Sequence, residues 1–538
     1  MTPRRPATLK ALFEASFARH GPRPAFTSMD VTLDYVEVER LSSAFGAFLR
    51  RGLGLAPGER VAIILPNLLQ YPVAVIGALR AGLVLVTVNP LYTPREVQFQ
   101  LADSGASAVL VLENFAATLE QALAGTSVRH IITTQVGDLF PTAKRLATNF
   151  AVKRMKRMVP PWRLPGAIAL PDALARSLAL PDTAVRPEDT ALLQYTGGTT
   201  GRAKGAVLTH GNLAANVAQT LKWLSGTLKE GEETMVTALP LFHIFALTAN
   251  LLLFVRLGGR NVLIPNARDM RDMLRTLARE RFTAITGVDT LYNALLDQPR
   301  FAQLDFSRLK LAIAGGMALQ RAVAERWQHA TGVPLVEGYG LTEASPIVSA
   351  NPVDAREFTG TLGRPLEGTE VKLRDERGTE VPEGEVGEIC VRGPQVMRGY
   401  WNAPEETSQA FFPGGWLRTG DLGRRTAGGE IRFVERRKDV IVVAGFKAYP
   451  SEIEAVAREH PGVADAGAVG VPHPRTGEAV ALFVVKRDPA LSAEALIAHC
   501  AQHLAPYKRP SRIEFRGALP KSPIGKILHR ALREEAVA

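Results

Sequence analysis

The sequence has little cysteine and no long apolar run, and both shortages restrict the class of protein. Its 538 residues include two cysteines, Cys390 and Cys500. Neither lies near a second Cys or a His cluster with metal-ligand spacing, so we expect buried structural thiols in a reducing compartment. The most apolar runs, PVAVIGAL and IFALTANLLLFV, are too short to span a bilayer, and the N-terminus lacks the apolar core of a signal peptide. These absences predict a soluble cytoplasmic protein.

Acidic residues are also in short supply, above all in one segment. The chain has 64 Lys and Arg against 53 Asp and Glu, a net charge of +11. Between residues 140 and 171 there is no acidic residue, and the basic ones are Lys144, Arg145, Lys153, Arg154, Lys156, Arg157 and Arg163. The apolar residues between them are Leu146, Phe150, Met155, Met158 and Val159. This mixture is typical of peripheral contact with the inner face of the cell membrane, although a solvated segment with snorkelling side chains has the same composition.

The order of apolar runs predicts the architecture of the larger part of the chain. The runs RVAIILPN, LVLVTVNP, SAVLVLE, HIITT and TALLQYTGG are interpreted as buried strands, with REVQFQLADSG and NLAANVAQTLKWL as intervening helices. A second series of strands follows in GRNVLIP, FTAITGV, LKLAIAGG and LVEGYG. Strands that alternate with helices indicate parallel layers, so we predict two doubly wound α/β subdomains.

The pattern changes beyond Thr361. The stretch EVKLRDERGTEVPEGEVGEICVRG alternates short strands with tight turns, which predicts a small antiparallel, β-barrel-like subdomain. Another helix–strand series then runs to the end of the chain. We therefore predict an N-terminal domain over residues 1–435 and a small, mobile α+β C-terminal domain over residues 436–538.

The stretch YTGGTTGRAKGA, from Tyr195 to Ala206, has the composition of a phosphate-binding loop. It fails the P-loop pattern, because Arg202 or Ala203 stands where the second glycine is required. It also fails the dinucleotide fingerprint, because Thr200 replaces a glycine. The loop therefore indicates phosphate binding without assigning the reaction.

Four further segments carry polar side chains in suitable settings. LPLFHIFAL places His243 in an apolar wall, and EGYGLTEASP places Thr342 and Glu343 after a strand and a glycine turn. GGWLRTGDLG presents Asp421 in a tight turn, and LPKSPIGKILHRALR presents Lys526 near the C-terminus. Taken singly, His243 is more typical of a core histidine and Asp421 of a turn residue.

In this order, the five segments resemble the acyl-activating (adenylate-forming) superfamily of acyl-CoA synthetases, luciferases and peptide-synthetase adenylation domains. The likeness extends from about residue 10 to 535. Together with FTAITGVDTLYNALL, GPQVMRGYWNAPEET and RRKDVIVVAGFKAYPSEIE, the segments are similar to bacterial long-chain fatty-acid–CoA ligases. Five ordered motifs are far more specific than one glycine-rich loop.

The resemblance implies a reaction in two halves. A fatty-acid carboxylate attacks the α-phosphate of ATP, which gives an acyl-adenylate and pyrophosphate, and the thiol of CoA then displaces AMP. The implied cofactor is Mg²⁺, with ATP and CoA as co-substrates. The resemblance leaves room for a homodimer and implies no nucleic-acid partner.

Roles follow residue by residue from the same resemblance. The implied catalytic residues are Lys526, which would bridge the carboxylate and the α-phosphate, His243, which would lie beside the acyl carboxylate, and Lys204. The implied ATP- and AMP-binding residues are Thr196, Gly197, Gly198, Thr199, Thr200, Gly201, Gly315, Gly316, Glu337, Gly338, Tyr339, Thr342, Asp421 and Arg436. Thr196 and Glu343 would lie near Mg²⁺.

The second half-reaction implies a further set of residues. Lys438 matches the hinge about which the C-terminal domain of these enzymes rotates. Rotation would bring Gly445, Phe446 and Lys447 to CoA. One departure is Leu247, which occupies the place of a tryptophan gate found in some long-chain members, so gating is not carried over.

Three alternatives stay open. The substrate could be a medium-chain or aryl acid, because one sequence does not measure an acyl tunnel. The product could be an acyl-adenylate passed to a carrier protein, although AGFKAYP resembles the CoA users. A non-catalytic basic protein that binds membranes or nucleic acid rests on the net charge alone, which bears on association rather than chemistry.

Overall fold

The computed structural model describes residues 7–196, 203–522 and 525–537. The chain forms two compact units, which are described separately. The first consists of the chain up to Thr359 together with Gly363–Glu370 and Arg392–Phe411. The second consists of Gly360–Leu362, Val371–Val391 and the chain from Phe412 onward.

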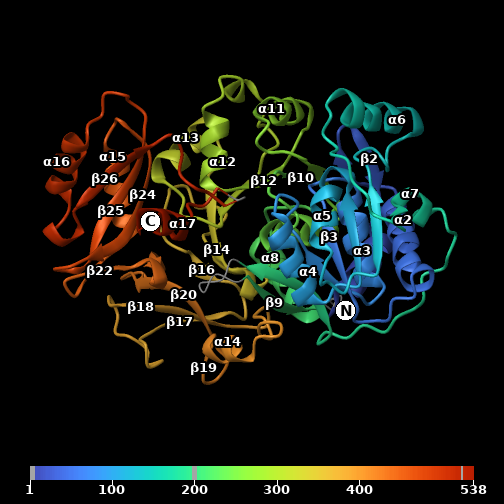
Figure 1. Ribbon diagram of the computed structural model, residues 1–538, viewed down its shortest axis with the longest axis horizontal. Helices are drawn as coiled ribbons and strands as arrows, with labels where there is room; N and C mark the ends of the chain where they lie inside the picture. Colours follow the sequence, from blue (N-terminus) through green and yellow to red (C-terminus); the bar gives the residue numbers. More distant parts are fainter. Residues whose placement is uncertain (1–6, 197–202, 523–524, 538) are drawn as a thin grey trace. The chain divides into compact units, whose positions relative to one another are not determined.

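The first unit contains a seven-stranded sheet in the order β7-β6-β5-β3-β4-β8-β9 (Figure 1). Its strands are β3 (Arg60–Ile64), β4 (Val84–Thr87), β5 (Ala108–Leu112), β6 (His130–Thr134), β7 (Ile168–Ala169), β8 (Thr190–Thr196) and β9 (Lys204–Thr209). Neighbouring strands are parallel except β8 and β9, which form an antiparallel hairpin. Strands β3 to β5 are almost wholly buried, which is why they consist of continuous aliphatic runs.

A nine-stranded sheet in the same unit has the order β16-β15-β14-β13-β12-β10-β11-β1-β2. Its strands are β1 (Pro24–Ser28), β2 (Val31–Asp34), β10 (Thr234–Thr237), β11 (Arg260–Leu263), β12 (Ala284–Gly287), β13 (Leu311–Gly315), β14 (Leu335–Gly340), β15 (Ile347–Ala350) and β16 (Arg364–Pro365). In the sheet order from β1 through β11, β10, β12 and β13 to β14, neighbouring strands are parallel. The edge strand β2 on one side, and β15 and β16 on the other, pair antiparallel. The predicted α/β fold is confirmed, but the pairing of β1 with β11, which adds β1 and β2 to this sheet, was not predicted.

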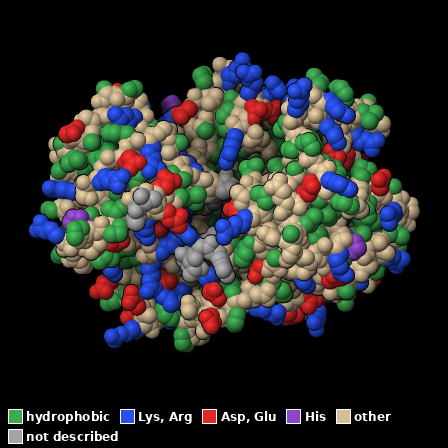
Figure 2. Space-filling view, viewed as in Figure 1, with side chains coloured by type: hydrophobic (Ala, Val, Ile, Leu, Met, Phe, Trp, Pro, Cys, Tyr) green, Lys and Arg blue, Asp and Glu red, His purple; other side chains and the backbone are tan. Residues whose placement is uncertain are grey.

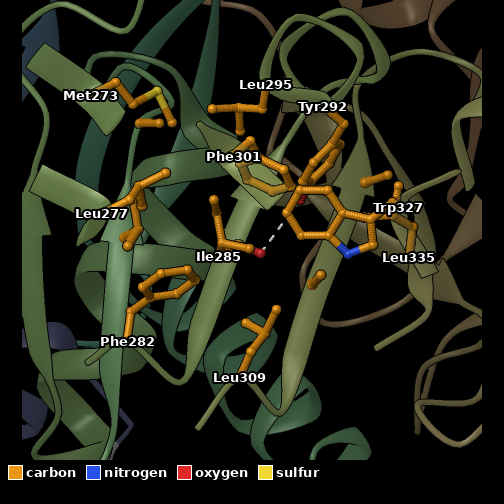
Figure 3. Packing of buried hydrophobic residues seen from close by; sticks show 14 of the residues in the cluster. Met273, Leu277, Phe282, Ile285, Tyr292, Leu295, Phe301, Leu309, Trp327 and Leu335 are labelled. Carbon is orange, nitrogen blue, oxygen red and sulfur yellow. Dashed lines mark hydrogen bonds between the residues drawn. The ribbon is translucent and has the colours of Figure 1, made fainter. Parts of the chain in front are cut away.

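An aromatic core lies against this second sheet, under α11 (Met270–Arg279), α12 (Asp289–Leu296) and α13 (Arg321–Thr331) (Figure 3). The buried ring of Trp327 packs edge-on against Tyr292, with 4.7 Å between the ring centroids, and lies 5.4 Å from Phe301. The Tyr292 hydroxyl donates a hydrogen bond of 2.6 Å to the carbonyl of Ile313 on β13. The core thereby fixes the strand that ends at the candidate site.

The second unit holds most of a five-stranded sheet and all of a second one. The first has the order β17-β18-β20-β19, with β21 paired to β20, and its strands are β17 (Glu370–Arg374), β18 (Val386–Arg392), β19 (Phe411–Phe412), β20 (Trp416–Arg425) and β21 (Ile431–Arg436). The second has the order β23-β22-β25-β24, with β26 paired to β25. Its elements are β22 (Ile441–Val443), β23 (Phe446–Ala448), β24 (Val463–His473), β25 (Gly477–Lys486), β26 (Arg512–Arg516), α15 (Pro450–Glu459), α16 (Ala493–His503) and α17 (His529–Val537).

The structure groups residues 412–435 with the C-terminal segment. The predicted boundary between residues 435 and 436 marks where a C-terminal domain would begin to rotate during the reaction, which is a different property from compactness, and it stays a prediction. Both cysteines are buried and free, as expected. Within the described ranges, no helix is long and apolar enough to cross a membrane.

Candidate active site

The glycine- and threonine-rich loop connects the two strands of the β8–β9 hairpin. Thr196 pairs with Lys204 in the hairpin register, so the residues at the two ends of the loop lie opposite each other. The predicted loop residues Gly197, Gly198, Thr199, Thr200 and Gly201 lie outside the described residues. The structure thus describes the base of the predicted phosphate cradle.

The base of this hairpin is held by aromatic residues. The Tyr195 hydroxyl donates a hydrogen bond of 2.5 Å to Oδ2 of Asp103, at the end of α4 (Pro94–Ser104). A Cβ atom at Gly205 would lie 3.2 Å from the Tyr195 ring and 3.5 Å from Cβ of Trp401, so glycine permits this close approach. Trp401 also donates its backbone N–H to the carbonyl of Gly205 at 2.8 Å. The two ends of the loop therefore start from a rigid support.

Glu343, the predicted metal ligand, lies in the short helix η6 (Thr342–Ala344) that follows β14. Its Oε1 atom accepts a hydrogen bond of 2.7 Å from the Tyr400 hydroxyl. The Lys204 ammonium lies over the ring of the same tyrosine, 5.4 Å from its centroid. Tyr400 therefore connects two residues that were predicted to bind ATP and its metal.

A cavity that is partly open to solvent lies at the carboxyl ends of β13 and β14, and its empty space, including solvent at the opening, is about 540 Å³. Strand ends of this kind are the usual ligand site of parallel α/β sheets. The lining includes the predicted residues His243, Gly315, Gly316, Gly338, Tyr339 and Thr342. It also includes Trp223 from α8 (His210–Trp223), Ala249 and Ile347, which were not predicted.

Glycine lets the walls of this cavity approach each other. A Cβ atom at Gly315 would lie 3.0 Å from the Phe245 ring and 3.2 Å from the carbonyl of Gly338. Gly316 has a φ of +79°, a conformation that glycine adopts without strain. The predicted roles of these glycines are therefore compatible with their conformations.

His243 lines the cavity as an uncharged group. Burial lowers the pKa of its imidazole to about 4. Its Nδ1 atom accepts a hydrogen bond of 3.3 Å from the N–H of Phe245, which leaves the proton of the neutral ring on Nε2. His243 is thus suited to donate one hydrogen bond without adding charge to the cavity.

Glu337 has a different environment from the other residues of its motif. Burial, the largest influence, and the nearby Asp289 together raise the pKa of its carboxyl to about 7, against a hydrogen bond from the Leu319 N–H that lowers it. That hydrogen bond to Oε1 measures 3.3 Å. Glu337 is therefore a half-buried acid whose charge changes near neutral pH.

In the second unit, Asp421 and Arg436 face each other across β20 and β21. Nε of Arg436 lies 3.0 Å from Oδ1 of Asp421, and the carboxylate side chain is only 1% exposed. Residues directly opposite in an antiparallel pair lie close enough for such a contact. The structure therefore brings these two predicted nucleotide-binding residues together.

Lys526 is presented by a tight turn in the same unit. Its carbonyl accepts the Ser522 N–H at 2.7 Å, and its own N–H donates to the Ser522 hydroxyl at 3.1 Å. Burial, the largest influence, and the positive charge of Arg436 lower the pKa of the Lys526 ammonium to about 8. The negative charges of Asp421 and Asp439 raise the pKa of Lys526, while the positive charge of Lys438 lowers it. The predicted hinge residue and the predicted catalytic lysine therefore share one charged neighbourhood.

The residues predicted to meet CoA lie on a hairpin between β22 and β23. Ala444 and Gly445 both have positive φ, at +49° and +85°, and make the turn. Phe446 is 60% exposed and stacks on Tyr507, with 5.1 Å between the ring centroids. Lys447 is exposed. The hairpin thus presents an aromatic face and a cation to solvent.

Tyr400 is the residue that the motif analysis missed. It lies in GPQVMRGYWNAPEET, a stretch that was informative only as a resemblance. Nothing in its spacing relates it to Glu343 or Lys204, because the contact arises from the folding of distant segments. The one available signal in the sequence was that Tyr400 and Trp401 are adjacent aromatic residues that follow a glycine.

The chain matches known families over both of its parts. Residues 13–401 match the AMP-binding enzyme family, and residues 452–526 match the AMP-binding enzyme C-terminal domain. The first match alone covers most of the chain, so the chain belongs to the AMP-binding enzymes.

Individual relatives extend this similarity over the full length. The chain is 52% identical over 538 residues to a long-chain-fatty-acid–CoA ligase of Escherichia coli O6:H1, covering 100% of this chain and 96% of the relative. It is 52% identical over 540 residues to a protein of the same name from Salmonella typhimurium, with the same coverage. Among solved structures, ATP-bound MatB from Rhodopseudomonas palustris has a TM-score of 0.85 at 28% identity, covering 98% of this chain and 99% of the other.

Proposed function

We propose that this protein activates a long-chain fatty acid with ATP and transfers the acyl group to CoA. In the first step a carboxylate oxygen attacks the α-phosphorus of ATP, the bond to the β-phosphate breaks, and pyrophosphate leaves. In the second step the CoA sulfur attacks the acyl carbon, the bond to AMP breaks, and the thiol proton is lost. The products are acyl-CoA, AMP and pyrophosphate.

The observation that carries this proposal is the 52% identity, over the whole chain, to a ligase named for long-chain fatty acids. The chemistry of the cavity agrees with such a substrate. Its described lining contains no Lys, Arg, Asp or Glu, and apolar side chains such as Trp223 and Ile347 form part of the wall. Burial of methylene groups against such a wall supplies about 0.8 kcal/mol per CH₂.

We assign His243 to the acyl carboxylate. A neutral imidazole with its proton on Nε2 can donate a hydrogen bond to a carboxylate without fixing it as a tight ion pair. The carboxylate then keeps its nucleophilic oxygen for the α-phosphorus. This role uses the low pKa and the hydrogen bond to Nδ1 described above.

We assign the hairpin base and Glu343 to the triphosphate and Mg²⁺. Among the described residues, no three His, Cys, Asp or Glu side chains are grouped to hold a metal ion. This agrees with Mg²⁺, which commonly binds through one or two carboxylates, waters and the phosphates of the substrate. The Glu343 carboxylate and the Thr196 hydroxyl are oxygen donors of the required kind, and the bound ion would neutralise charge on the phosphates.

In the second unit we assign Asp421, with help from Arg436, to the ribose hydroxyls and Lys526 to the α-phosphate. A cation at that phosphate would stabilise the charge that develops as pyrophosphate leaves. The hinge role of Lys438 and the CoA contacts of Gly445, Phe446 and Lys447 belong to the same proposal.

The direct test is AMP release that depends on CoA, measured with saturated acids from acetate to palmitate, oleate and benzoate. The proposal predicts the highest kcat/KM for acids of sixteen or eighteen carbons, about tenfold or more above octanoate, because even two further buried methylene groups supply about 1.6 kcal/mol. A maximum at octanoate or benzoate would assign the enzyme to medium-chain or aryl acids. Pyrophosphate exchange without CoA-dependent AMP release would instead favour transfer to a carrier protein.

We also propose that residues 140–171 contact the inner face of the cell membrane. Helix α6 (Thr142–Phe150) and the π-helical turn η3 (Ala151–Met155) contain no buried residue. The apolar residues that are more than half exposed in this segment are Leu146, Phe150, Met155 and Met158. Lys and Arg side chains and hydrophobic ones gather over α6 (Figure 2), a mixture that suits an anionic lipid surface.

This contact is testable by co-sedimentation with vesicles that contain phosphatidylglycerol or only phosphatidylcholine. We expect binding to the anionic vesicles alone, weakened by salt and by the double change Phe150→Ser and Met155→Ser. Leu178, an exposed leucine outside the segment, provides the control Leu178→Ser. Equal sedimentation of the parent protein with both vesicle types would contradict the electrostatic part of the proposal.

A further inference from the structure

A strap of seven residues, Gln395–Trp401, connects the two sides of the phosphate and metal site in the first unit. On one side it pairs alongside β9: the Val207 N–H donates to the carbonyl of Gly399 at 2.9 Å, and the Arg398 N–H donates to the carbonyl of Val207 at 3.1 Å. On the other side, the Met397 N–H donates to the carbonyl of Glu343 at 2.7 Å. The strap therefore holds the hairpin and η6 at a fixed separation.

Tyr400 is the residue of this strap that reaches both functional side chains. Its hydroxyl donates to Oε1 of Glu343 at 2.7 Å, and its ring lies under the Lys204 ammonium at 5.4 Å. Its backbone N–H donates to the Thr407 hydroxyl at 2.9 Å, which fixes the residue from behind. A phenol hydroxyl can donate this hydrogen bond to a carboxylate, which can only accept when it is ionised.

This arrangement gives a cation and an anion the same neutral partner. Lys204 and Glu343 carry opposite charges, and a direct ion pair between them would satisfy each with the other. The aromatic face stabilises the ammonium without neutralising it. The phenol donates to one carboxylate oxygen and leaves the charge of the carboxylate intact. Both residues thus keep their full charge for a ligand.

We propose that Tyr400 is a positioning residue that orients Glu343 toward the metal, holds Lys204 toward the phosphates, and keeps the two from pairing with each other. The inference rests on the proposed function, because it takes Mg²⁺ and ATP as the ligands. Oε2 of Glu343 is the oxygen that it assigns to the metal. Partners that orient metal ligands in this way typically contribute about 10- to 100-fold to metal affinity or activity.

The test separates the hydroxyl from the ring. Tyr400→Phe removes the hydrogen bond to Glu343 and keeps the ring under Lys204, whereas Tyr400→Leu removes both. Mn²⁺ binding in the presence of α,β-methylene-ATP is measured by electron paramagnetic resonance, without fatty acid or turnover. We expect Tyr400→Phe to weaken Mn²⁺ binding by about 10-fold or more. Tyr400→Leu should weaken it as much and also raise the KM for ATP in pyrophosphate exchange.

Two controls make the result specific. Tyr35→Phe removes another buried phenol, which donates to the carbonyl of Gly259 at 2.8 Å, and should leave Mn²⁺ affinity at the parent value. In a Glu343→Gln background, Tyr400→Phe should have no further effect on Mn²⁺ affinity, because the hydroxyl acts through that carboxylate. An independent effect in that background would show that Tyr400 acts only by supporting the fold.

Failure of this proposal is distinguishable from failure of the proposed function. A parent protein that exchanges pyrophosphate, together with a Tyr400→Phe variant of parent Mn²⁺ affinity, would overturn the role of Tyr400 alone. A parent protein that binds Mn²⁺ with the nucleotide but exchanges no pyrophosphate with any fatty acid would contradict the proposed function. In that case the loss of Mn²⁺ affinity in Tyr400→Phe would still support the positioning of Glu343.

Discussion

The cavity of the first unit and the surroundings of Lys526 in the second unit differ in the charge that they present to a ligand. The described lining of the cavity has no Lys, Arg, Asp or Glu, and burial lowers the pKa of its histidine, His243, to about 4, so that this side chain is uncharged at neutral pH. Around Lys526, by contrast, the charges of Arg436, Asp421, Asp439 and Lys438 all act on one ammonium group. One site is built from shape and apolar surface, and the other from charge.

The difference indicates which parts of the reaction each site can serve. Apolar contact is non-directional and roughly proportional to area, so it can hold a fatty chain but distinguishes ground state from transition state poorly. Fixed charge acts at one point and is strong where water is excluded. We therefore expect changes in the charged site to reduce the rate, and changes in the cavity to alter substrate affinity.

The largest expected effect is that of Lys526→Ala. Loss of a cation at the developing charge should reduce adenylate formation by about 10²- to 10³-fold. Thioester formation from supplied acyl-adenylate should be largely spared, because no pyrophosphate leaves in that step. Pyrophosphate exchange and single-turnover thioester formation measure the two halves separately.

Lys521 provides the matched control for this change. It lies five residues earlier and pairs with Asp465 at 2.7 Å instead of with the charges around Lys526. Lys521→Ala should leave both half-reactions near parent rates. Equal losses in both half-reactions for Lys526→Ala would contradict the separation of roles.

The pH dependence of adenylate formation sharpens the same comparison. The pKa of Lys526 is about 8, so the lysine is charged below that pH and neutral above it. The rate should therefore fall about tenfold between pH 7 and 9, as expected for one group with this pKa. His243, with a pKa of about 4, should contribute no inflection in that range, and any inflection from Glu337, with a pKa of about 7, should lie about one pH unit below that of Lys526. A Lys526→Arg variant that remains active should lose the alkaline limb, and an unchanged limb would assign it to another group.

The strands and the motif residues could be predicted from the sequence, but the contacts between them could not. Strands β3, β4 and β5 are buried on both faces, so their apolar runs identify them directly. The pairing of β1 with β11 depends on register between distant segments, which local pattern does not contain. Tyr400 escaped prediction for the same reason: its partner Glu343 lies far away in the sequence. The local periodicity of apolar residues indicates which residues are buried. The contacts within a functional site depend instead on the packing of segments that are distant in the sequence.

A smaller effect is expected from His243→Asn in the cavity. Asparagine can keep the acceptor that receives the Phe245 N–H, but it removes the Nε2 donor that we assign to the fatty-acid carboxylate. Loss of one hydrogen bond to a charged carboxylate, about 1.5 kcal/mol, should raise the KM for fatty acid about tenfold. The KM for ATP and the melting temperature should stay near parent values. A large fall in kcat at unchanged KM would place His243 in the chemical step, contrary to the contrast drawn above.

The smallest expected effect concerns stability in the charged unit. His529 on α17 lies 2.6 Å from Oε1 of Glu454 and 3.9 Å from Oδ2 of Asp439. Burial alone would lower the pKa of His529, but the carboxylates of Glu454, Asp439 and Glu435 outweigh it and raise the pKa. The charged imidazole therefore stabilises the folded state fully below the unfolded pKa of about 6.5, and the contribution is lost as the pH rises through the raised pKa.

His529→Gln should accordingly lower the melting temperature at pH 6 by about 2–4 °C, from the loss of about 1 kcal/mol in a charge-assisted hydrogen bond. The difference between parent and variant should shrink as the pH rises above the raised pKa. His503→Gln, at an exposed histidine of α16, is the control and should follow the parent at every pH. A difference that stays constant with pH would mean that His529 stabilises the fold through packing and not through its charge. In that case the charged groups of this unit, among them Asp439 and its neighbour Lys438, would serve the reaction rather than the stability of the fold.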